Sequence, residues 1–365
     1  MSRIPVKMSA VLLTGHGGFE KLECRDDVDV PSVGADKVLL RVLAAGINNT
    51  DINTRTAWYS KSVTGETNAG GSEGFESAED DDASWSGTPL VFPRIQGADC
   101  CGEIVAVGEG VDESRIGERV LVRTMQQAPV DYQPFICWTV GSECDGGFAQ
   151  YMTAYGAETF KVDCDWSDIE LASIPCAYST AENMLERAKV SEGEIVLITG
   201  ASGGVGSAAV QLAKRRGAKV VAQTGATKLN EVKALGADEV VDRNANLAET
   251  LGTEVVDVVV DLVAGESWPC LLEVLKRGGR YATAGAIAGP IVELDVRTLY
   301  LKDLTLIGCT FQRQNVFENL VGYIERNEIK PLVARHYPLK DIVRAQEDFL
   351  SKKHVGKLVL VPPQG

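Results

Sequence analysis

The spacing of apolar residues changes about halfway along the chain. Up to about residue 172, short apolar runs such as KVLLRVLAAGI (37–47) and GEIVAVGEGV (102–111) alternate with glycine-marked turns, which is typical of short β-strands. From about residue 173, apolar strands alternate with helical segments. Such alternation predicts a parallel sheet that is covered by helices on both faces. The sequence therefore predicts an α/β fold with a β-rich first part.

The second half of the chain divides into regular strand and helix units. Its predicted strands span 194–199, 219–224, 239–242, 256–263 and 280–285, and its predicted helices span 207–217, 229–236 and 267–279. The tail adds one helix-like segment (339–353) and a closing strand (356–362). The pattern thus predicts a short mixed tail after the α/β part.

One segment of the first half has a different composition. Residues 61–88 are rich in Gly, Ser, Glu and Asp and contain seven acids against the single Lys61, a net charge of −6. Because few aliphatic side chains are available to offset the entropy of ordering, we predict an exposed loop. The whole chain carries a net charge of −15, from 36 basic and 51 acidic residues. This excess of acid argues against nucleic acid or an anionic membrane as a partner.

The remaining composition indicates a globular protein outside the secretory route. No uncharged apolar run reaches the roughly 18 residues that a membrane span needs, and the first residues lack the basic start and apolar block of a secretory signal. We therefore expect a cytoplasmic location. The chain has nine cysteines and three histidines, and no two cysteines form a Cys-x-x-Cys pair. We therefore expect no structural zinc site, and we expect no disulfide framework in a chain without a secretory signal.

The glycine-rich turn at 200–206 is the candidate cofactor site. It lies between a predicted strand and a predicted helix, where glycines let the backbone approach a pyrophosphate and the helix N-terminus offers free N–H groups. Glycines also mark ordinary turns, so the strand–turn–helix context is what favours a dinucleotide. The candidate residues of this turn are Gly200, Ser202, Gly203, Gly204, Val205 and Gly206.

The end of the next strand favours NADPH over NADH. NAD sites place an Asp or Glu there to bind the ribose 2′-hydroxyl. Here Thr224 is followed by a small polar turn that ends at Lys228, and no acid is present. Lys228 suits a 2′-phosphate, and Arg243, after the following strand, is a second candidate cation. The alternative is that both cations are ordinary solvated surface charges.

Seven segments spread over most of the chain carry a family resemblance. They are AAGINNTDINTR, GADCCGEIVAVGEGV, IPCAYSTAENML, LITGASGGVGSAAVQLAKRRGAKV, KALGAD, LYLKDLTLIG and HVGKLVL. Together they resemble the medium-chain dehydrogenase/reductase superfamily, and specifically its zinc-free quinone-oxidoreductase branch. Only the acidic segment falls outside the resemblance.

The resemblance implies two domains with the active site in the cleft between them. A GroES-like β-barrel catalytic domain is expected over 1–172, with the acidic insertion at 61–88. A Rossmann domain, with its doubly wound parallel sheet, is expected over 173–310, and the chain is expected to return to the catalytic domain over 311–365. The resemblance also implies a homodimer or homotetramer that pairs through the edges of the Rossmann sheets, for which LTLIGCTF (304–311) is the candidate edge.

The resemblance allows the metal site to be tested position by position. Zinc-dependent relatives carry a Cys ligand where Asn48 stands and a His-Glu pair where Ala98 and Asp99 stand, and only Cys176 falls on a retained Cys position. Asparagine is a poor zinc ligand and alanine is none, so the set falls short of the three protein ligands of a catalytic zinc. We therefore predict no catalytic metal, and a residual metal role of Cys176 or Asp99 is left open.

Without a Lewis acid, alcohol oxidation loses its main means of stabilising an alkoxide. We therefore expect hydride transfer from NADPH to a quinone or to the β-carbon of an α,β-unsaturated carbonyl, with hydrogen-bond donors stabilising the developing oxyanion. By resemblance, Asn48 and Tyr59 are the donors, and Asp51 orients its neighbours or the cofactor ribose. The alternative for Asn48 is a simple turn after a strand. The resemblance further implies cofactor contacts for Thr180, Gly285, Ala286 and Lys357.

Two other functions and a second role for the acidic segment stay open. The protein is alternatively an alcohol dehydrogenase of the same superfamily with a degenerate metal site, or an NADPH-binding protein without enzymatic activity. The acidic segment is either a solvated loop or a lid that disfavours strongly anionic substrates through like-charge repulsion. The physiological substrate is not predicted by the sequence.

Overall fold

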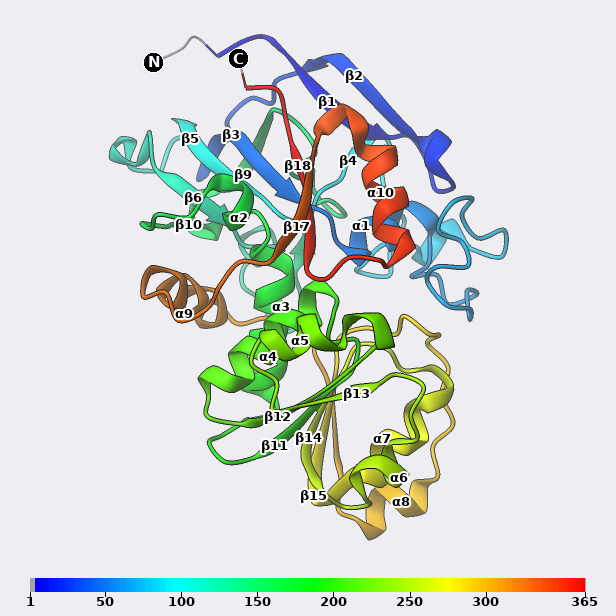
Figure 1. Cartoon of the computed structure of the whole chain (residues 1–365). Coiled ribbons are helices and arrows are strands. Elements are labelled where there is room, and N and C mark those ends of the chain that lie inside the picture. The colour runs from blue at the N-terminus through cyan, green and yellow to red at the C-terminus, as the bar shows by residue number, and fades with distance from the viewer. Residues whose placement is uncertain (1–3, 365) are drawn as a thin grey trace.

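The computed structural model describes residues 4–364 and contains the predicted parallel sheet (Figure 1). Six strands pair in parallel in the order β13-β12-β11-β14-β15-β16. Counted from the first strand of the unit, this order is 3-2-1-4-5-6, the order of a dinucleotide-binding Rossmann sheet. The strands are β11 (Ile195–Ile198), β12 (Lys219–Thr224), β13 (Glu239–Asp242), β14 (Val256–Asp261), β15 (Leu275–Thr283) and β16 (Thr305–Gly308).

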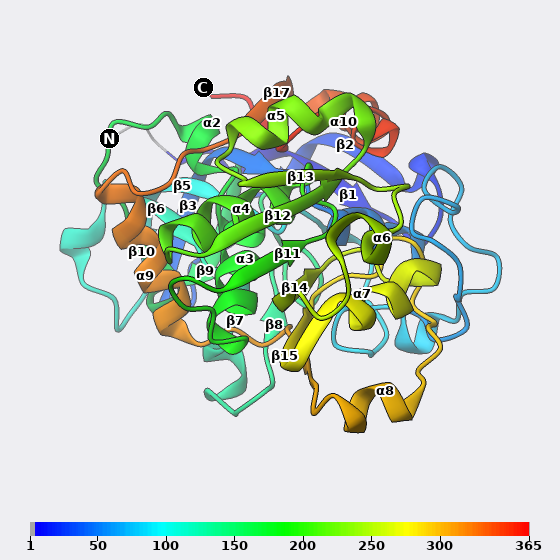
Figure 2. The same ribbon diagram turned by 60° about the horizontal axis from the view of Figure 1, so that its bottom comes forward.

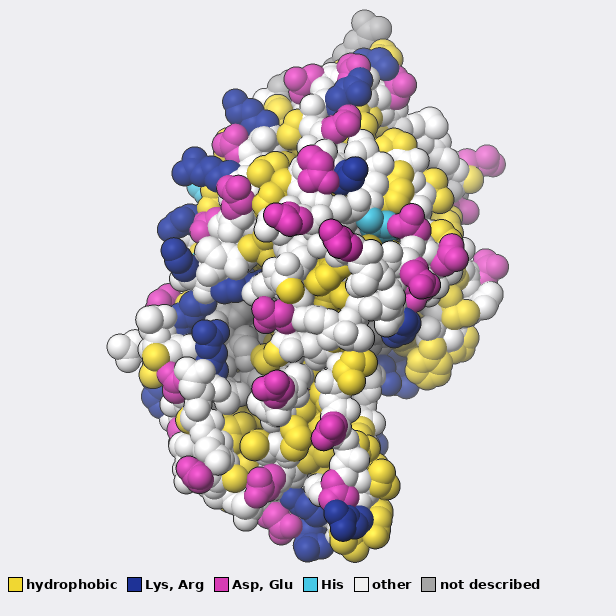
Figure 3. All heavy atoms as spheres, turned by 90° about the vertical axis from the view of Figure 1, so that its right-hand side faces the viewer, with side chains coloured by type: hydrophobic (Ala, Val, Ile, Leu, Met, Phe, Trp, Pro, Cys, Tyr) yellow, Lys and Arg dark blue, Asp and Glu magenta, His cyan; other side chains and the backbone are white. Residues whose placement is uncertain are grey.

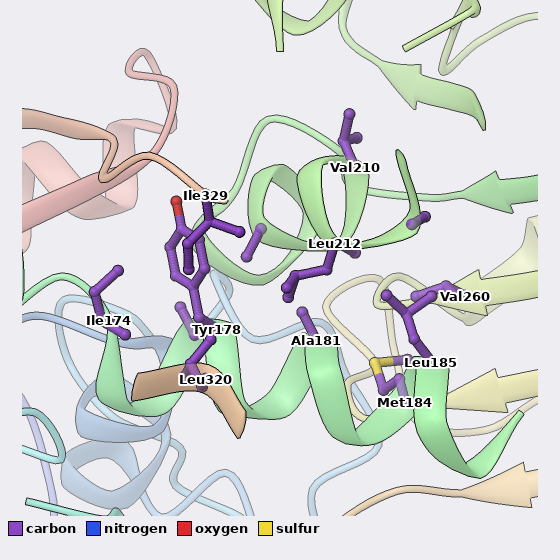
Figure 4. Packing of buried hydrophobic residues seen from close by; sticks show 14 of the residues in the cluster. Ile174, Tyr178, Ala181, Met184, Leu185, Val210, Leu212, Val260, Leu320 and Ile329 are labelled. Atoms are coloured by element: carbon purple, nitrogen blue, oxygen red, sulfur yellow. The ribbon is translucent and has the colours of Figure 1, made fainter. Parts of the chain in front are cut away.

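Helices cover both faces of this sheet because alternate strand residues are buried on opposite sides. Val196, Ile198 and Val260 pack with residues of α3 and α4 in one core cluster. Figure 4 shows Val260 beside Met184 and Leu185 of α3. Leu197 and Val259 pack against α6 and α7 in another cluster. Figure 2 shows the two helix layers on either side of the sheet. The helices are α3 (Pro175–Arg187), α4 (Gly204–Arg215), α5 (Leu229–Ala234), α6 (Leu247–Leu251), α7 (Trp268–Val274) and α8 (Val296–Leu301).

The tail of the chain returns to the catalytic domain. β18 pairs with β3 in antiparallel register, with Val359 opposite Gly46, and thereby joins a sheet of order β10-β6-β5-β3-β18-β17 in which β9 also pairs with β3. A second sheet has the order β2-β1-β4, and β7 pairs with β8. The exact limits of the three predicted segments, 1–172, 173–310 and 311–365, stay a prediction.

The elements of the catalytic domain follow the predicted short strands. The strands are β1 (Lys7–Leu13), β2 (Leu22–Asp29), β3 (Lys37–Gly46), β4 (Arg94–Ile95), β5 (Cys101–Val107), β6 (Arg119–Val122), β7 (Met125–Gln126), β8 (Trp138–Thr139), β9 (Tyr151–Tyr155), β10 (Thr159–Lys161), β17 (Val333–Pro338) and β18 (Lys357–Val361). The helices outside the Rossmann sheet are α1 (Asn49–Thr56), α2 (Asp168–Leu171), α9 (Gln314–Glu325) and α10 (Ile342–Ser351).

One predicted helix needs correction, and the tail holds a helix that was not predicted. The helix expected over 267–279 ends at Val274, because Leu275 already pairs with Val256 as the start of β15. The tail holds a further helix, α9, which the sequence analysis did not predict. Its buried residues recur at helical spacing, so the apolar pattern was present: they are Val316, Phe317, Leu320, Val321, Tyr323 and Ile324.

The acidic segment is anchored to the rest of the molecule. Its acidic side chains are exposed except for the half-buried Asp82, but other residues of the segment are buried, among them Val63, Thr67, Ala83 and Ser84. The fully buried guanidinium of Arg55 donates hydrogen bonds to the carbonyl oxygens of Gly17 and Gly71. Most residues of the segment are exposed, as predicted for a loop, but a minority are buried and hydrogen bonds fix the backbone where aliphatic side chains are scarce.

None of the helices in the described part of the chain is long and apolar enough to cross a membrane. β16 pairs only with β15, so it is an edge strand of the Rossmann sheet, as expected for LTLIGCTF. Pairing of two chains along this edge stays a proposal that a molar mass in solution would test.

Candidate active site

The glycine-rich turn lies at the carboxyl end of β11, where parallel α/β sheets bind their ligands. Gly200 has a φ of +58°, and a Cβ on Gly206 would collide with the carbonyl oxygen of Gly200. Only glycine fits both places without strain. The N-terminus of α4 starts at Gly204 and has no side-chain cap among the described residues. Its first N–H groups are thus available to an anion, as a pyrophosphate requires.

Lys228 and Arg243 lie beside the end of β12, as the sequence predicted. The ammonium of Lys228 donates to Ser202 Oγ at 3.5 Å and to the backbone carbonyl of Lys352. Burial lowers the pKa of Lys228, and the nearby charge of Arg243 lowers it further. Among the described residues neither cation forms an ion pair within 4.0 Å. Thr224, at the end of the strand, is buried and its hydroxyl has no hydrogen-bond partner in the structure.

Lys352 is a third cation at this place, and the sequence analysis missed it. It follows α10 with a φ of +51°, so it reaches the Rossmann domain from the catalytic domain. Its ammonium donates to Asn49 Oδ1 at 3.3 Å, and burial together with the charge of Lys228 lowers its pKa to about 8. The signal in the sequence was only the pair KK at 352–353, which resembles any solvated helix end.

The other predicted cofactor residues lie around the opposite part of the same sheet edge. Gly285 and Ala286 follow β15, and Thr180 lies on α3, where its hydroxyl accepts a hydrogen bond from Gln312 at 3.5 Å. Asp261, which the sequence analysis did not single out, accepts hydrogen bonds from Thr199 Oγ1 at 2.5 Å and from Tyr281 Oη at 2.5 Å. This buried carboxylate therefore joins the ends of β11, β14 and β15.

A buried polar cluster occupies the bottom of the site at the start of α1. Lys357 is 3% exposed and Asp99 is 0% exposed, and their ammonium and Oδ2 atoms lie 2.8 Å apart. The Lys357 ammonium also donates to Asn48 Oδ1 and, at 2.9 Å, to the carbonyl of Ile47. Asn48 Nδ2 donates to Asp99 Oδ2 at 2.8 Å, and the amide of Cys176 donates to Asp99 Oδ1 at 2.6 Å. The cluster thus joins four distant parts of the chain.

These contacts change two of the predicted roles. All three N–H groups of the Lys357 ammonium have partners inside the cluster. We therefore expect Lys357 to act on the cofactor indirectly, and not through a hydrogen bond from its ammonium. The stem of Lys357 lies directly under Gly204, where a Cβ would clash with it, so the residue supports the glycine-rich turn from below. The side-chain amide of Asn48 already donates its hydrogen bonds within the same cluster. Asn48 therefore has no strong donor left for a substrate oxyanion.

Asp51 orients the backbone around this cluster. Its Oδ2 accepts from the amide of Asn48 at 2.7 Å, and its Oδ1 accepts from the amides of Gly97 and Ala98 at 3.2 and 3.1 Å. Burial raises the pKa of Asp51 to about 7, although the amide donors favour the charged form. In the structure Asp51 therefore orients its neighbours, and a contact with the cofactor ribose stays a prediction.

The residues at the zinc position of the family do not suit a metal. Asn48 and Asp99 both bind the Lys357 ammonium, so a cation of the protein itself already neutralises the oxygen donors. Burial and the charge of Asp99 raise the pKa of the Cys176 thiol, which disfavours the thiolate that zinc binds. The described residues contain no group of three or more His, Cys, Asp or Glu placed to hold a metal ion.

Thr50 and Tyr59 form a hydroxyl pair beside the buried cluster. Tyr59 Oη donates to Thr50 Oγ1 at 3.0 Å, which leaves the Thr50 hydroxyl proton free for another acceptor. Burial raises the pKa of Tyr59, so its phenol stays protonated. Trp85 lies edge-on to Tyr59 with ring centres 5.3 Å apart, and Trp58 lies at 5.8 Å. Thr50 was missed in the sequence because a hydroxyl two residues after Asn48 carries no signal by itself.

Comparison with known proteins identifies the family of the chain. Residues 34–163 match the model of the alcohol dehydrogenase GroES-like domain, and residues 204–326 match that of the zinc-binding dehydrogenase. A crystal structure of a putative alcohol dehydrogenase from Sinorhizobium meliloti is 46% identical, with a TM-score of 0.87 over 99% of this chain and 98% of that one.

Curated relatives extend the comparison to enzymes. Rat quinone oxidoreductase is 27% identical over 97% of this chain and 98% of its own length. An acryloyl-coenzyme A reductase of Metallosphaera sedula is 28% identical over 97% of this chain and 99% of its own length. The chain is an oxidoreductase that belongs to the medium-chain dehydrogenase/reductase superfamily and is quinone oxidoreductase-like.

Proposed function

We propose that the protein is an NADPH-dependent, zinc-independent reductase of quinones or α,β-unsaturated carbonyl compounds. The observation that carries this proposal is the Lys357 ammonium, which binds Asn48 and Asp99 where zinc-dependent relatives keep metal ligands. Reduction of a polarised double bond needs no Lewis acid to stabilise an alkoxide. The names of the quinone and acryloyl-thioester relatives agree with this choice.

The site fits NADPH because it offers free backbone N–H groups and cations that have no ion-pair partner among the described residues. The uncapped start of α4 suits the pyrophosphate. Lys228, Arg243 and Lys352 form a cationic group that suits the 2′-phosphate, and none of the three has an ion-pair partner within 4.0 Å among the described residues. Lys352 belongs to the catalytic domain, so one phosphate would be held from both domains. When bound, NADPH supplies the hydride.

The hydroxyl pair is the best candidate for the substrate side of the reaction. As the carbonyl oxygen of an enone or quinone gains negative charge, the Thr50 hydroxyl can donate a hydrogen bond to it, while the protonated phenol of Tyr59 donates to Thr50 Oγ1. Asn48 and Asp51 act by positioning α1, which carries Thr50. The rings of Trp58 and Trp85 keep the phenol of Tyr59 in place.

The proposal is tested by a substrate panel with both cofactors. Purified protein is offered NADPH or NADH with quinones and enones, and NADP⁺ or NAD⁺ with primary and secondary alcohols, while its zinc content is measured by elemental analysis. We expect NADPH oxidation with at least one quinone or enone at substoichiometric zinc. Alcohol oxidation that requires stoichiometric zinc would overturn the proposal in favour of an alcohol dehydrogenase. Cofactor binding without any turnover would favour the non-enzymatic alternative.

A further inference from the structure

The acidic segment 61–88 is hydrogen-bonded to the Rossmann domain. The amide of Thr67 donates to the carbonyl of Ile287 at 3.1 Å. Ile287 directly follows Gly285 and Ala286, the residues expected beside the nicotinamide. The segment therefore touches the far wall of the site rather than projecting away from it.

The same segment is fastened to the catalytic domain at several points. The amide of Phe19 donates to the carbonyl of Ser72 at 3.3 Å, and the Arg55 guanidinium holds the carbonyl of Gly71. Near the end of the segment, the amide of Ser86 donates to Glu143 Oε1 at 3.0 Å. The segment is thus a strap that is hydrogen-bonded to both domains.

The two faces of the strap differ in chemistry. Its inner face contributes Trp85, which packs on Tyr59, and its Gly65 carbonyl accepts a hydrogen bond from the indole of Trp58 at 3.0 Å. Six of its seven acids are exposed and Asp82 is half-buried, and none of the seven forms an ion pair with a described residue. Figure 3 looks onto the side where the segment protrudes in Figure 1, and acidic side chains predominate on the upper right of that face.

We infer that residues 61–88 form a lid that selects uncharged unsaturated carbonyl substrates and rejects coenzyme A thioesters. The inference rests on the proposed reductase function and narrows its substrate class. A coenzyme A thioester carries a pyrophosphate and a 3′-phosphate, so its approach to a mouth with a net charge of −6 is opposed by like-charge repulsion. An enone, a quinone or a short neutral thioester meets only the aromatic inner face.

The test compares two substrates with the same reacting group. The but-2-enoyl thioesters of coenzyme A and of N-acetylcysteamine share the double bond and the thioester carbonyl, and they differ in the phosphates. For the wild-type protein we expect kcat/KM with the neutral thioester to exceed that with the coenzyme A thioester by at least about tenfold at low salt. Raising the ionic strength from 0.01 M to 1 M shortens the screening length from about 30 Å to about 3 Å and should narrow this ratio.

Two charge variants separate the lid from the net charge of the protein. The lid variant changes four exposed acids without side-chain partners to their amides: Glu73→Gln, Glu76→Gln, Glu79→Gln and Asp80→Asn. The control variant removes four equally exposed acids outside the strap: Glu109→Gln, Glu113→Gln, Glu239→Gln and Glu249→Gln. We expect the lid variant to raise kcat/KM for the coenzyme A thioester about tenfold and to leave the neutral thioester unchanged, whereas the control variant changes neither.

Failure of the lid and failure of the proposed function give different results. If neither thioester, nor any enone or quinone, is reduced by the wild-type protein, the reductase function itself is wrong. If both thioesters are reduced equally well at every salt concentration, or if the lid and control variants behave alike, the reductase function stands and the lid inference is overturned. The salt series uses only wild-type protein, so this conclusion does not depend on how the variants fold.

Discussion

Lys228→Ala is expected to weaken NADPH binding about 10- to 100-fold and to leave NADH binding within about twofold of the wild type. The ammonium of Lys228 has only Ser202 Oγ and a backbone carbonyl as partners, so it can turn to a 2′-phosphate without breaking an ion pair. A hydrogen bond to a charged group contributes about 1.5–3 kcal/mol, which corresponds to this range of affinity. NADH has no 2′-phosphate and does not use the interaction. Titration calorimetry of the purified protein with each cofactor measures both constants.

A matched lysine on the same strand serves as the control. Lys219 lies at the amino end of β12, opposite the cofactor edge, and is exposed. Lys219→Ala should bind both cofactors like the wild type. Lys352→Gln should lower NADPH affinity in the same direction as Lys228→Ala, because the two ammonium groups are neighbours. Equal losses of NADPH and NADH affinity in Lys228→Ala would contradict its assignment to the 2′-phosphate.

Lys357→Met is expected to lower the free energy of unfolding by about 3–5 kcal/mol. The substitution keeps most of the apolar stem under the glycine-rich turn but leaves Asp99 as a buried carboxylate without its cation. It also removes a donor from Asn48 and from the carbonyl of Ile47. Urea unfolding followed by circular dichroism gives the free energy of each variant.

A double-mutant cycle separates the charge pair from packing. In the Lys357→Met and Asp99→Asn double variant, no buried charge is left unpaired, so its loss of stability should be smaller than the sum of the two single losses by at least about 1 kcal/mol. Additive losses would show that Lys357 and Asp99 act independently and that the cluster is not held by their ion pair.

The fold and the cofactor turn were predictable because their signals are local. Apolar strands at regular spacing, a glycine-rich turn and the absence of an acid after Thr224 all lie within short stretches of sequence. The resemblance implied a Rossmann domain, and the strand order 3-2-1-4-5-6 seen in the structure is that of such a sheet. α9 was missed although its apolar residues have helical spacing, because the residue before it, Arg313, is not one of the usual capping residues that mark a helix start.

The role of Lys357 could not be derived from the sequence, because it depends on contacts between distant segments. Lys357 meets Asp99 and Asn48, which lie 258 and 309 positions away along the chain. In the sequence, Lys357 is only a lysine in the segment HVGKLVL, for which the resemblance implied a cofactor contact. Likewise, the composition of the acidic segment predicted exposure, while its hydrogen bonds to Ile287 and Arg55 arise only in the folded chain.

The position to which hydride is delivered tests the central claim most directly. Protein with zinc removed and verified by elemental analysis is incubated with an enone from the panel and with NADPH that carries deuterium at the transferable C4 position. The product is then analysed by NMR. Zinc-independent reduction of the double bond predicts deuterium on the β-carbon of a saturated ketone. Deuterium on the former carbonyl carbon of an alcohol, or activity that appears only when zinc is returned, would contradict it.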